Sequence, residues 1–170
     1  MEGQLIVAAS AVTPVLSQPD LRLAVDTKPN DATRLIFDFN KHALAQAMRT
    51  RGLTSVAITY SGCGDEGRPE EVAFEPTDVD EGLEPIVVAQ MRYRWDEERG
   101  CGGSELVFDD MHLRDVAEAL RDAAIELLGR GGYENNDGGQ AKFTLLAINA
   151  AAELEHRDVC TESDVSTHAL

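Results

Sequence analysis

Apolar residues recur every three or four positions after residue 31, and this spacing predicts an amphipathic helix. Asn30 or Asp31 stands in front of the stripe as an N-cap. Gly52 follows it and is placed to end the helix. The stripe contains Leu35, Ile36, Phe39, Ala43, Ala47 and Met48.

A second stripe with the same spacing predicts another amphipathic helix. Asp109 or Asp110 is expected to cap it, and Gly129 is expected to stop it. Charged residues fill the positions between the apolar ones, as on a helix with one face in water. The stripe contains Leu113, Val116, Ala117, Leu120, Ala124, Leu127 and Leu128.

Other parts of the chain alternate apolar and polar residues, a pattern typical of strands with one buried face. Val56, Ile58 and Tyr60 follow this rule. Gly-rich, charged stretches at 61–71 and 96–103 are predicted to be loops. Further strands are predicted at 72–74, 86–95, 106–108, 143–148 and 154–159.

Two amphipathic helices and four or five strands predict an α+β fold, a two-layer sandwich with an antiparallel sheet. We expect residues 31–170 to form a single domain, because a chain of 170 residues is long enough to bury one core. Residues 1–30 contain three prolines. They are predicted to form an extended N-terminal arm with one short strand at 21–25.

The predicted domain is strongly acidic. The chain has 15 Lys and Arg residues against 31 Asp and Glu residues, for a formal net charge of −16. Such a surface repels phosphate backbones, so direct binding of nucleic acid is not expected. It attracts basic protein surfaces and divalent cations. From Asp65 to Glu84 the chain has nine acidic residues and a single basic residue, Arg68. A composition of this kind is typical of a solvated loop.

Cysteine and histidine usage argues against a disulfide scaffold and against zinc chemistry. Three cysteines stand at unpaired spacings, as expected in a reducing cytoplasm. The four histidines form no His-x-His or His-Glu-x-x-His pattern. The N-terminus lacks a positive region ahead of its apolar residues, and no apolar run is long enough to span a membrane. A cytoplasmic protein without a membrane segment is therefore predicted.

Two polar turns are the candidate binding sites. The first, 62–67, matches G-x-G-x-x-G after a predicted strand. Arg68-Pro69 follows it instead of a helix, and Asp65 and Glu66 repel a pyrophosphate, so we do not expect it to bind a dinucleotide. The second turn, 133–139, carries four polar side chains and two glycines, which suits a tight turn. The candidate binding residues are Asp65, Glu66, Glu134, Asn135, Asn136 and Asp137.

Carboxylates in these turns are hard oxygen ligands of the kind that Mg²⁺ and Ca²⁺ prefer. If the two turns meet in space, Asp65, Glu134 and Asp137 are the candidate ligands of such an ion. The spacing inside the second turn is not that of an EF-hand. Turn chemistry alone also explains these residue types.

Three segments together resemble a family of bacterial, plasmid and phage proteins of unknown function. They are Tyr-Ser-Gly-Cys-Gly-Asp-Glu-Gly at 60–67, Gly-Tyr-Glu-Asn-Asn-Asp-Gly-Gly at 132–139, and the acidic tail from 154 to 168 with its Thr-Glu-Ser. Phe143-Thr144 stands where the family has a Phe-Thr strand, whereas Ala141-Lys142 departs from an acidic residue and a glycine. The resemblance covers roughly 32–170. It implies a shared fold and a mobile-element context, and no reaction.

These observations favour a small acidic protein-interaction domain of mobile-element type that binds a basic partner surface, as an inhibitor or a nucleic-acid mimic. One alternative is a divalent-metal-dependent hydrolase that uses the 62–67 and 133–139 turns. Another is a structural accessory whose turns serve folding alone. Arg92, Tyr93 and Trp95 are amphipathic residues of the kind enriched at interfaces, and a role in the core fits them equally well.

Overall fold

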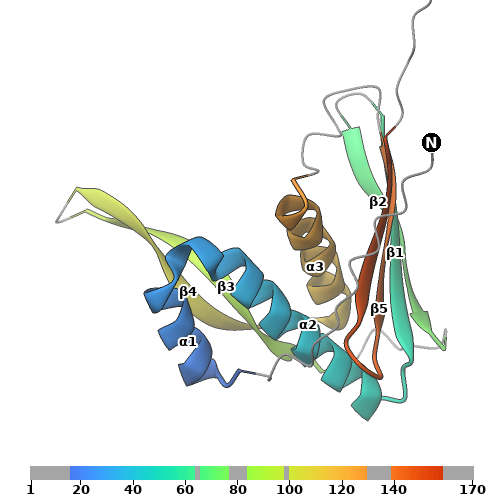
Figure 1. The fold of residues 1–170 in the computed structure, drawn as a ribbon, viewed down its shortest axis with the longest axis horizontal. Helices are drawn as coiled ribbons and strands as arrows, with labels where there is room; N and C mark the ends of the chain where they lie inside the picture. The colour runs from blue at the N-terminus through green and yellow to red at the C-terminus, as the bar shows by residue number, and fades with distance from the viewer. Residues whose placement is uncertain (1–15, 64–65, 77–83, 98–99, 130–138, 159–170) are drawn as a thin grey trace, which may run out of the picture.

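The computed structural model describes residues 16–63, 66–76, 84–97, 100–129 and 139–158. Within them the chain forms an α+β fold with a four-stranded antiparallel sheet and a separate two-stranded hairpin (Figure 1). No helix in these ranges is long and apolar enough to cross a membrane. The elements, in chain order, are α1 (Gln18–Thr27), η1 (Pro29–Asp31), α2 (Ala32–Thr50), β1 (Ser55–Cys63), β2 (Glu66–Glu75), β3 (Ile86–Asp96), β4 (Cys101–Met111), α3 (Leu113–Leu127), β5 (Gly139–Leu146) and β6 (Ala152–Asp158).

The larger sheet has the strand order β2-β1-β5-β6, with every neighbouring pair antiparallel. Its inner face is lined by alternate residues of these strands, among them Val56, Ile58, Phe143 and Leu145, which are completely or almost completely buried. The apolar stripe of α3 packs on this face and supplies Val116, Ala117 and Leu120 to the same core (Figure 1). The two-layer arrangement predicted from the stripes is therefore confirmed.

Helix α2 joins the sheet to the hairpin. Its C-terminal half supplies Leu44 and Met48 to the core beneath the sheet, and Arg49 donates a hydrogen bond to the carbonyl oxygen of Ala147 in the turn after β5. Its N-terminal half packs with α1 against the base of the β3–β4 hairpin. Because one continuous helix makes both contacts, it sets the position of the hairpin relative to the sheet (Figure 1).

A second, smaller apolar cluster fills the space between α1, α2 and the base of the hairpin. Leu21 and Val25 of α1 lie one helical turn apart and pack with Ala89 of β3 and Leu106 of β4. Phe39 and Phe108 meet edge to face, with 5.8 Å between ring centroids. This cluster covers the inner part of the hairpin and leaves its outer part beyond the helices.

One side chain of α2 completes the backbone hydrogen bonding of β3. The amide nitrogen of Asn40 donates to the carbonyl oxygen of Ala89 at 2.9 Å, and its amide oxygen accepts from the Ala89 N–H at 2.7 Å. Asn40 is only 9% exposed and Ala89 is fully buried. The carboxamide therefore takes the place of a neighbouring strand at this point, and it satisfies two backbone groups that have no access to water.

The N-terminal part of the chain differs from the prediction. Residues 21–25, predicted to be a strand in an extended arm, are part of helix α1. Ser17 caps this helix by accepting from the backbone N–H of Asp20, and Pro19 lies in its first turn, where a missing N–H costs nothing. Residues 1–15 of the predicted arm lie outside the described ranges.

Two loop predictions were also wrong. Residues 66–71, predicted to be part of a loop, belong to β2, and β4 begins at Cys101 and runs through Gly102 and Gly103. Pairing with β1 and β3 along the whole length of these strands outweighs the poor strand propensity of their glycines and acidic residues. Asp109 and Asp110, the expected caps of the second helix, are residues of β4, and His112 occupies the N-cap position of α3.

Replacement of Asn40 tests how firmly the hairpin is attached. Asn40→Ala leaves the N–H and the carbonyl of Ala89 buried without partners, so we expect it to lower the free energy of unfolding by about 2–4 kcal/mol. The measurement is urea unfolding. Asn30→Ala, which changes an exposed asparagine next to the same helix, is the matched control and should shift stability by less than about 0.5 kcal/mol. Equal losses in the two variants would contradict the role assigned to Asn40.

Candidate interaction surface on the β3–β4 hairpin

The outer part of the β3–β4 hairpin extends past the helices that cover its base. We call residues 91–97 and 100–105 the arm. The strands pair without a register shift from Ile86–Met111 to Asp96–Cys101, so the arm is a regular two-stranded ribbon. Its residues are exposed throughout, except that Asp96 is half-buried. Side chains on the arm therefore contribute little to the core.

One face of the arm carries large apolar side chains. Met91, Tyr93 and Trp95 alternate along β3, and 42%, 65% and 56% of their surface is exposed. They continue the row that begins with Ala89, which is buried against α2. The apolar face of β3 is thus covered at the base and bare on the arm. Exposed aromatic residues grouped in this way mark interaction surfaces more often than single exposed apolar residues do.

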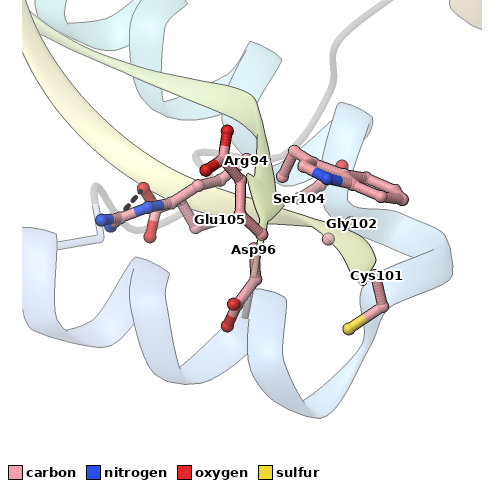
Figure 2. Close-up of a pocket in the computed structure, with 9 residues that line it drawn as sticks. Arg94, Asp96, Cys101, Gly102, Ser104 and Glu105 are labelled. Atoms are coloured by element: carbon pink, nitrogen blue, oxygen red, sulfur yellow. Dashed lines mark ion pairs between the residues drawn. The ribbon is translucent and has the colours of Figure 1, made fainter. Parts of the chain in front are cut away.

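The opposite face of the arm carries ion pairs between the two strands. Arg92 contacts Asp109 at 2.8 Å, nearer the base of the hairpin. Arg94 contacts Glu105 diagonally across the ribbon at 3.7 Å (Figure 2). These side chains are largely exposed, so each pair contributes at most about 1 kcal/mol. Both arginines of β3 are matched by carboxylates. The sequence from 86 to 111 has six Asp and Glu residues against three arginines, so the net charge of the hairpin is negative.

Small residues on β4 create space on the arm. The Tyr93 side chain lies so close to Gly102 that a Cβ atom there would come within 1.7 Å of the Tyr93 hydroxyl oxygen. A Cβ atom at Gly103 would meet no atom within 4 Å. An open hollow of about 620 Å³ lies here, lined by residues on both strands from Arg94 to Glu97 and from Cys101 to Glu105 (Figure 2). The thiol of Cys101 is free and exposed at the end of this hollow.

A smaller groove lies between α2, α3, β5 and β6. Its volume is about 60 Å³, and its walls are mostly apolar, with Phe37, Leu127 and Leu154 among them. The buried Lys41 reaches its edge, where it pairs with Asp38 at 3.0 Å and stands 5.4 Å from the centre of the Phe37 ring. Lys41 is thus satisfied within the chain, and the groove is too small for more than a few atoms.

Of the six residues predicted to form a binding or metal site, one, Glu66, lies within the described ranges. Glu66 is the first residue of β2 and pairs with Cys63 at the end of β1. Asp65, Glu134, Asn135, Asn136 and Asp137 lie outside the described ranges. The described residues contain no group of three or more His, Cys, Asp or Glu side chains placed to hold a metal ion.

The strands next to the two predicted turns have their ends at the same end of the larger sheet. Gly62 of β1 pairs with Gly67 of β2 on one side and with Gly139 of β5 on the other. The chain thus leaves β1 for the first turn, and enters β5 from the second turn, at adjacent strand ends. The G-x-G-x-x-G segment joins two antiparallel strands, and not a strand and a helix, as the Arg68-Pro69 that follows it indicated.

The sequence predicted the strand that carries the aromatic residues of the arm, but not that these residues are exposed. The strand predicted at 86–95 is confirmed as β3, and an interface or a core explained its aromatic residues equally well. The deciding signal lies on the opposite strand, where Gly102 and Ser104 pair with Trp95 and Tyr93. A strand that faced a core would place larger apolar residues at these positions.

Comparison with known proteins identifies the chain at the level of family. A search of the curated proteins found no significant match, and a search of the solved structures found none. A family model, described as a family of unknown function (DUF6878), matches residues 36–170, from the first turns of α2 to the end of the chain. This match spans most of the chain and agrees with the extent of the resemblance noted in its turns. The protein is therefore a member of the DUF6878 family of unknown function.

Proposed function

We propose that this protein is an acidic protein-interaction domain whose contact element is the arm. The observation that carries the proposal is the exposure of Tyr93 and Trp95, at 65% and 56%, on a ribbon that the core does not need. Tyr and Trp supply much of the binding energy in protein interfaces, because they bury large areas with few rotatable bonds. Each has a polar group that stays satisfied in water and in an interface.

The charge of the chain supports a basic partner. With a net charge of −16, the protein attracts positively charged surfaces and speeds their association, and it repels nucleic acid. Lysine and arginine side chains of a partner also bind the faces of aromatic rings. We therefore propose a cytoplasmic role in which the arm contacts a basic protein segment. The likeness of its turns to those of plasmid and phage proteins supports a partner encountered by mobile elements.

Replacement of the aromatic residues tests the contact element. A fluorescein-labelled peptide of alternating lysine and valine serves as the basic probe, and its anisotropy reports binding. Trp95→Ser and Tyr93→Ser leave the net charge unchanged, and we expect each to weaken binding by about tenfold or more, as for buried aromatic residues in interfaces. Because both side chains are exposed, the free energy of unfolding should change by less than about 0.5 kcal/mol.

Ile148→Ser is the control for this experiment. Ile148 is 82% exposed in the turn after β5, away from the arm, and its replacement also preserves charge. It should bind the peptide like the wild type. If Ile148→Ser weakens binding as much as Trp95→Ser, the loss is not specific to the arm; if neither variant weakens binding, charge alone holds the peptide. Either result would show that the arm is not the contact element.

Ionic strength tests the electrostatic part of the proposal. The Debye length falls from about 10 Å at 0.1 M salt to about 3 Å at 1 M. We expect the dissociation constant of the peptide to rise more than about tenfold over this range, because attraction by the whole acidic surface is screened. A peptide in which lysine is replaced by glutamine should bind weakly at every salt concentration. Affinity that stays constant with salt would contradict a basic partner.

A second function, a divalent-metal-dependent hydrolase, is supported by the strand register at the predicted turns. β1 and β5 are hydrogen-bonded neighbours at Gly62 and Gly139, and the chain segments with Asp65, Glu134 and Asp137 adjoin these strand ends. An ion held by carboxylates there would polarise a phosphoryl or carbonyl oxygen. We rank this proposal second, because the placement of neighbouring strands is indirect support.

Thermal melts test the second proposal. The protein is melted in EDTA and then with Mg²⁺, Ca²⁺, Mn²⁺ or Zn²⁺. An ion that binds the native state raises the melting temperature. At an ion concentration of 100 times the dissociation constant, binding stabilises the native state by about 2.7 kcal/mol. The rise should vanish in Asp137→Ala and persist in Asp115→Ala, which removes an exposed carboxylate in the first turn of α3. Equal shifts in both variants would exclude a site at Asp137.

A further inference from the structure

We propose that the basic partner binds as an extended strand along the outer edge of β4, beside residues 101–105. This inference rests on the proposed function and adds the geometry of the complex. A strand bound in this way extends the two-stranded ribbon to three strands. Main-chain hydrogen bonds then supply affinity, and side chains on the two faces supply specificity.

The pairing pattern shows which backbone groups of β4 point outward. Asn40 bonds both the N–H and the carbonyl of Ala89, so these groups point away from β4. Ala89 pairs directly with Phe108, which makes this a non-hydrogen-bonded pair of the antiparallel ribbon. Such pairs recur at every second position, and the register is unbroken. The N–H and carbonyl groups of Ser104 and Gly102 therefore point to the outer edge of β4.

This edge is open on the arm. Within the described residues, no hydrogen bond from another element reaches the outward groups of Gly102 or Ser104, and both residues are exposed. Nearer the base the same edge is covered, because Leu106 is buried in the cluster with α1. The outer edge of β3 is taken up by α2 at Ala89. The accessible edge of β4 thus spans the short stretch 101–105, enough for a few residues of a partner.

Charge complementarity selects β4 over β3 for a basic strand. Along its accessible stretch, 101–105, β4 carries Glu105 and no lysine or arginine, whereas Asp109 and Asp110 lie at the covered base of the hairpin. β3 contains Arg92 and Arg94, which would stand beside the lysines or arginines of an added strand. Like charges on neighbouring strands destabilise a sheet, and opposite charges stabilise it. A basic strand therefore fits the β4 edge.

The glycines of β4 also fit this mode of binding. Glycine weakens a strand and often marks a place where another backbone comes close. Gly102 makes room for the Tyr93 ring. At Gly103 a Cβ atom would stand in open space, and its φ is not positive, so nothing in the described part of the chain requires glycine there.

A second copy of the chain fits the same edge poorly. Two chains with a net charge of −16 repel each other. We therefore commit to a basic segment of another protein as the occupant. Self-association of the protein through the arm, seen as a Trp95-dependent dimer by sedimentation, would overturn this assignment.

Amide hydrogen exchange of the full-length protein tests the strand geometry directly. In the free protein the amides of Gly102 and Ser104 should exchange fast, and those of Gly103 and Glu105, which bond to β3, should exchange slowly. Saturation with the lysine–valine peptide should slow exchange at Gly102 and Ser104 at least tenfold. The same peptide, N-methylated at its central residues, keeps its charge but loses its donors, and it should bind at least tenfold more weakly.

A pair of substitutions tests the same edge from the protein side. Ser104→Pro removes an outward N–H and places a ring on the edge, whereas Ser104→Ala keeps the N–H. We expect the proline variant to lose at least tenfold in peptide affinity and the alanine variant to lose less than twofold. The slow amides of Gly103 and Glu105 show whether the arm of each variant is intact.

The outcomes separate this inference from the proposed function. If the peptide binds and Trp95→Ser weakens it, yet exchange at Gly102 and Ser104 does not change, the arm is the contact element and strand addition is wrong. If the N-methylated peptide binds as tightly as the unmodified one, strand addition is likewise overturned. If Trp95→Ser leaves binding unchanged, the proposed function fails, and the inference fails with it.

Discussion

The paired hydrogen bonds between Asn40 and Ala89 are the constraint on which the arrangement of this protein depends. They fasten the hairpin to the same helix that fills the core beneath the larger sheet. A helix cannot offer its own backbone to a strand edge, because its N–H and carbonyl groups already bond within the helix. The carboxamide of one buried asparagine supplies the missing donor and acceptor. The hairpin is thereby held at its base, and its outer part is left to project.

This attachment explains why the arm projects beyond the helices that cover the base of the hairpin. The inner face of the larger sheet is covered by α3 and by the C-terminal half of α2, and the base of the hairpin is covered by α1 and the N-terminal half of α2. Beyond Ala89 and Leu106 no helix continues over the ribbon (Figure 1). Tyr93 and Trp95 occupy the positions that come next on the same face, so their exposure follows from the length of the hairpin relative to its cover.

The sequence predicted the elements whose side chains repeat with a clear period. The stripes that became α2 and α3, the alternation that became β1 and the further predicted strands led to the correct α+β fold. The prediction from the sequence failed at Gly102 and Gly103 of β4, where strand pairing outweighs the poor strand propensity of glycine. It also failed for α1, because this helix is short and buries only Leu21 and Val25. The exposure of Trp95 was not predictable from its own strand, because the same alternation describes a strand that faces a core. The turns at 62–67 and 133–139 stood out by composition, and the structure describes only the strands beside them.

Contact between the arm and a basic partner is tested most directly with Trp95 itself, which is the only tryptophan of the chain. Its fluorescence is measured with the neutral quencher acrylamide, first in the free protein and then in the protein saturated with the lysine–valine peptide, with saturation confirmed by anisotropy. We expect strong quenching in the free protein, because the side chain is 56% exposed, and much weaker quenching in the complex, because the peptide covers the arm. Equal quenching in the free and the saturated protein would show that the peptide binds elsewhere and would contradict the arm as the contact element.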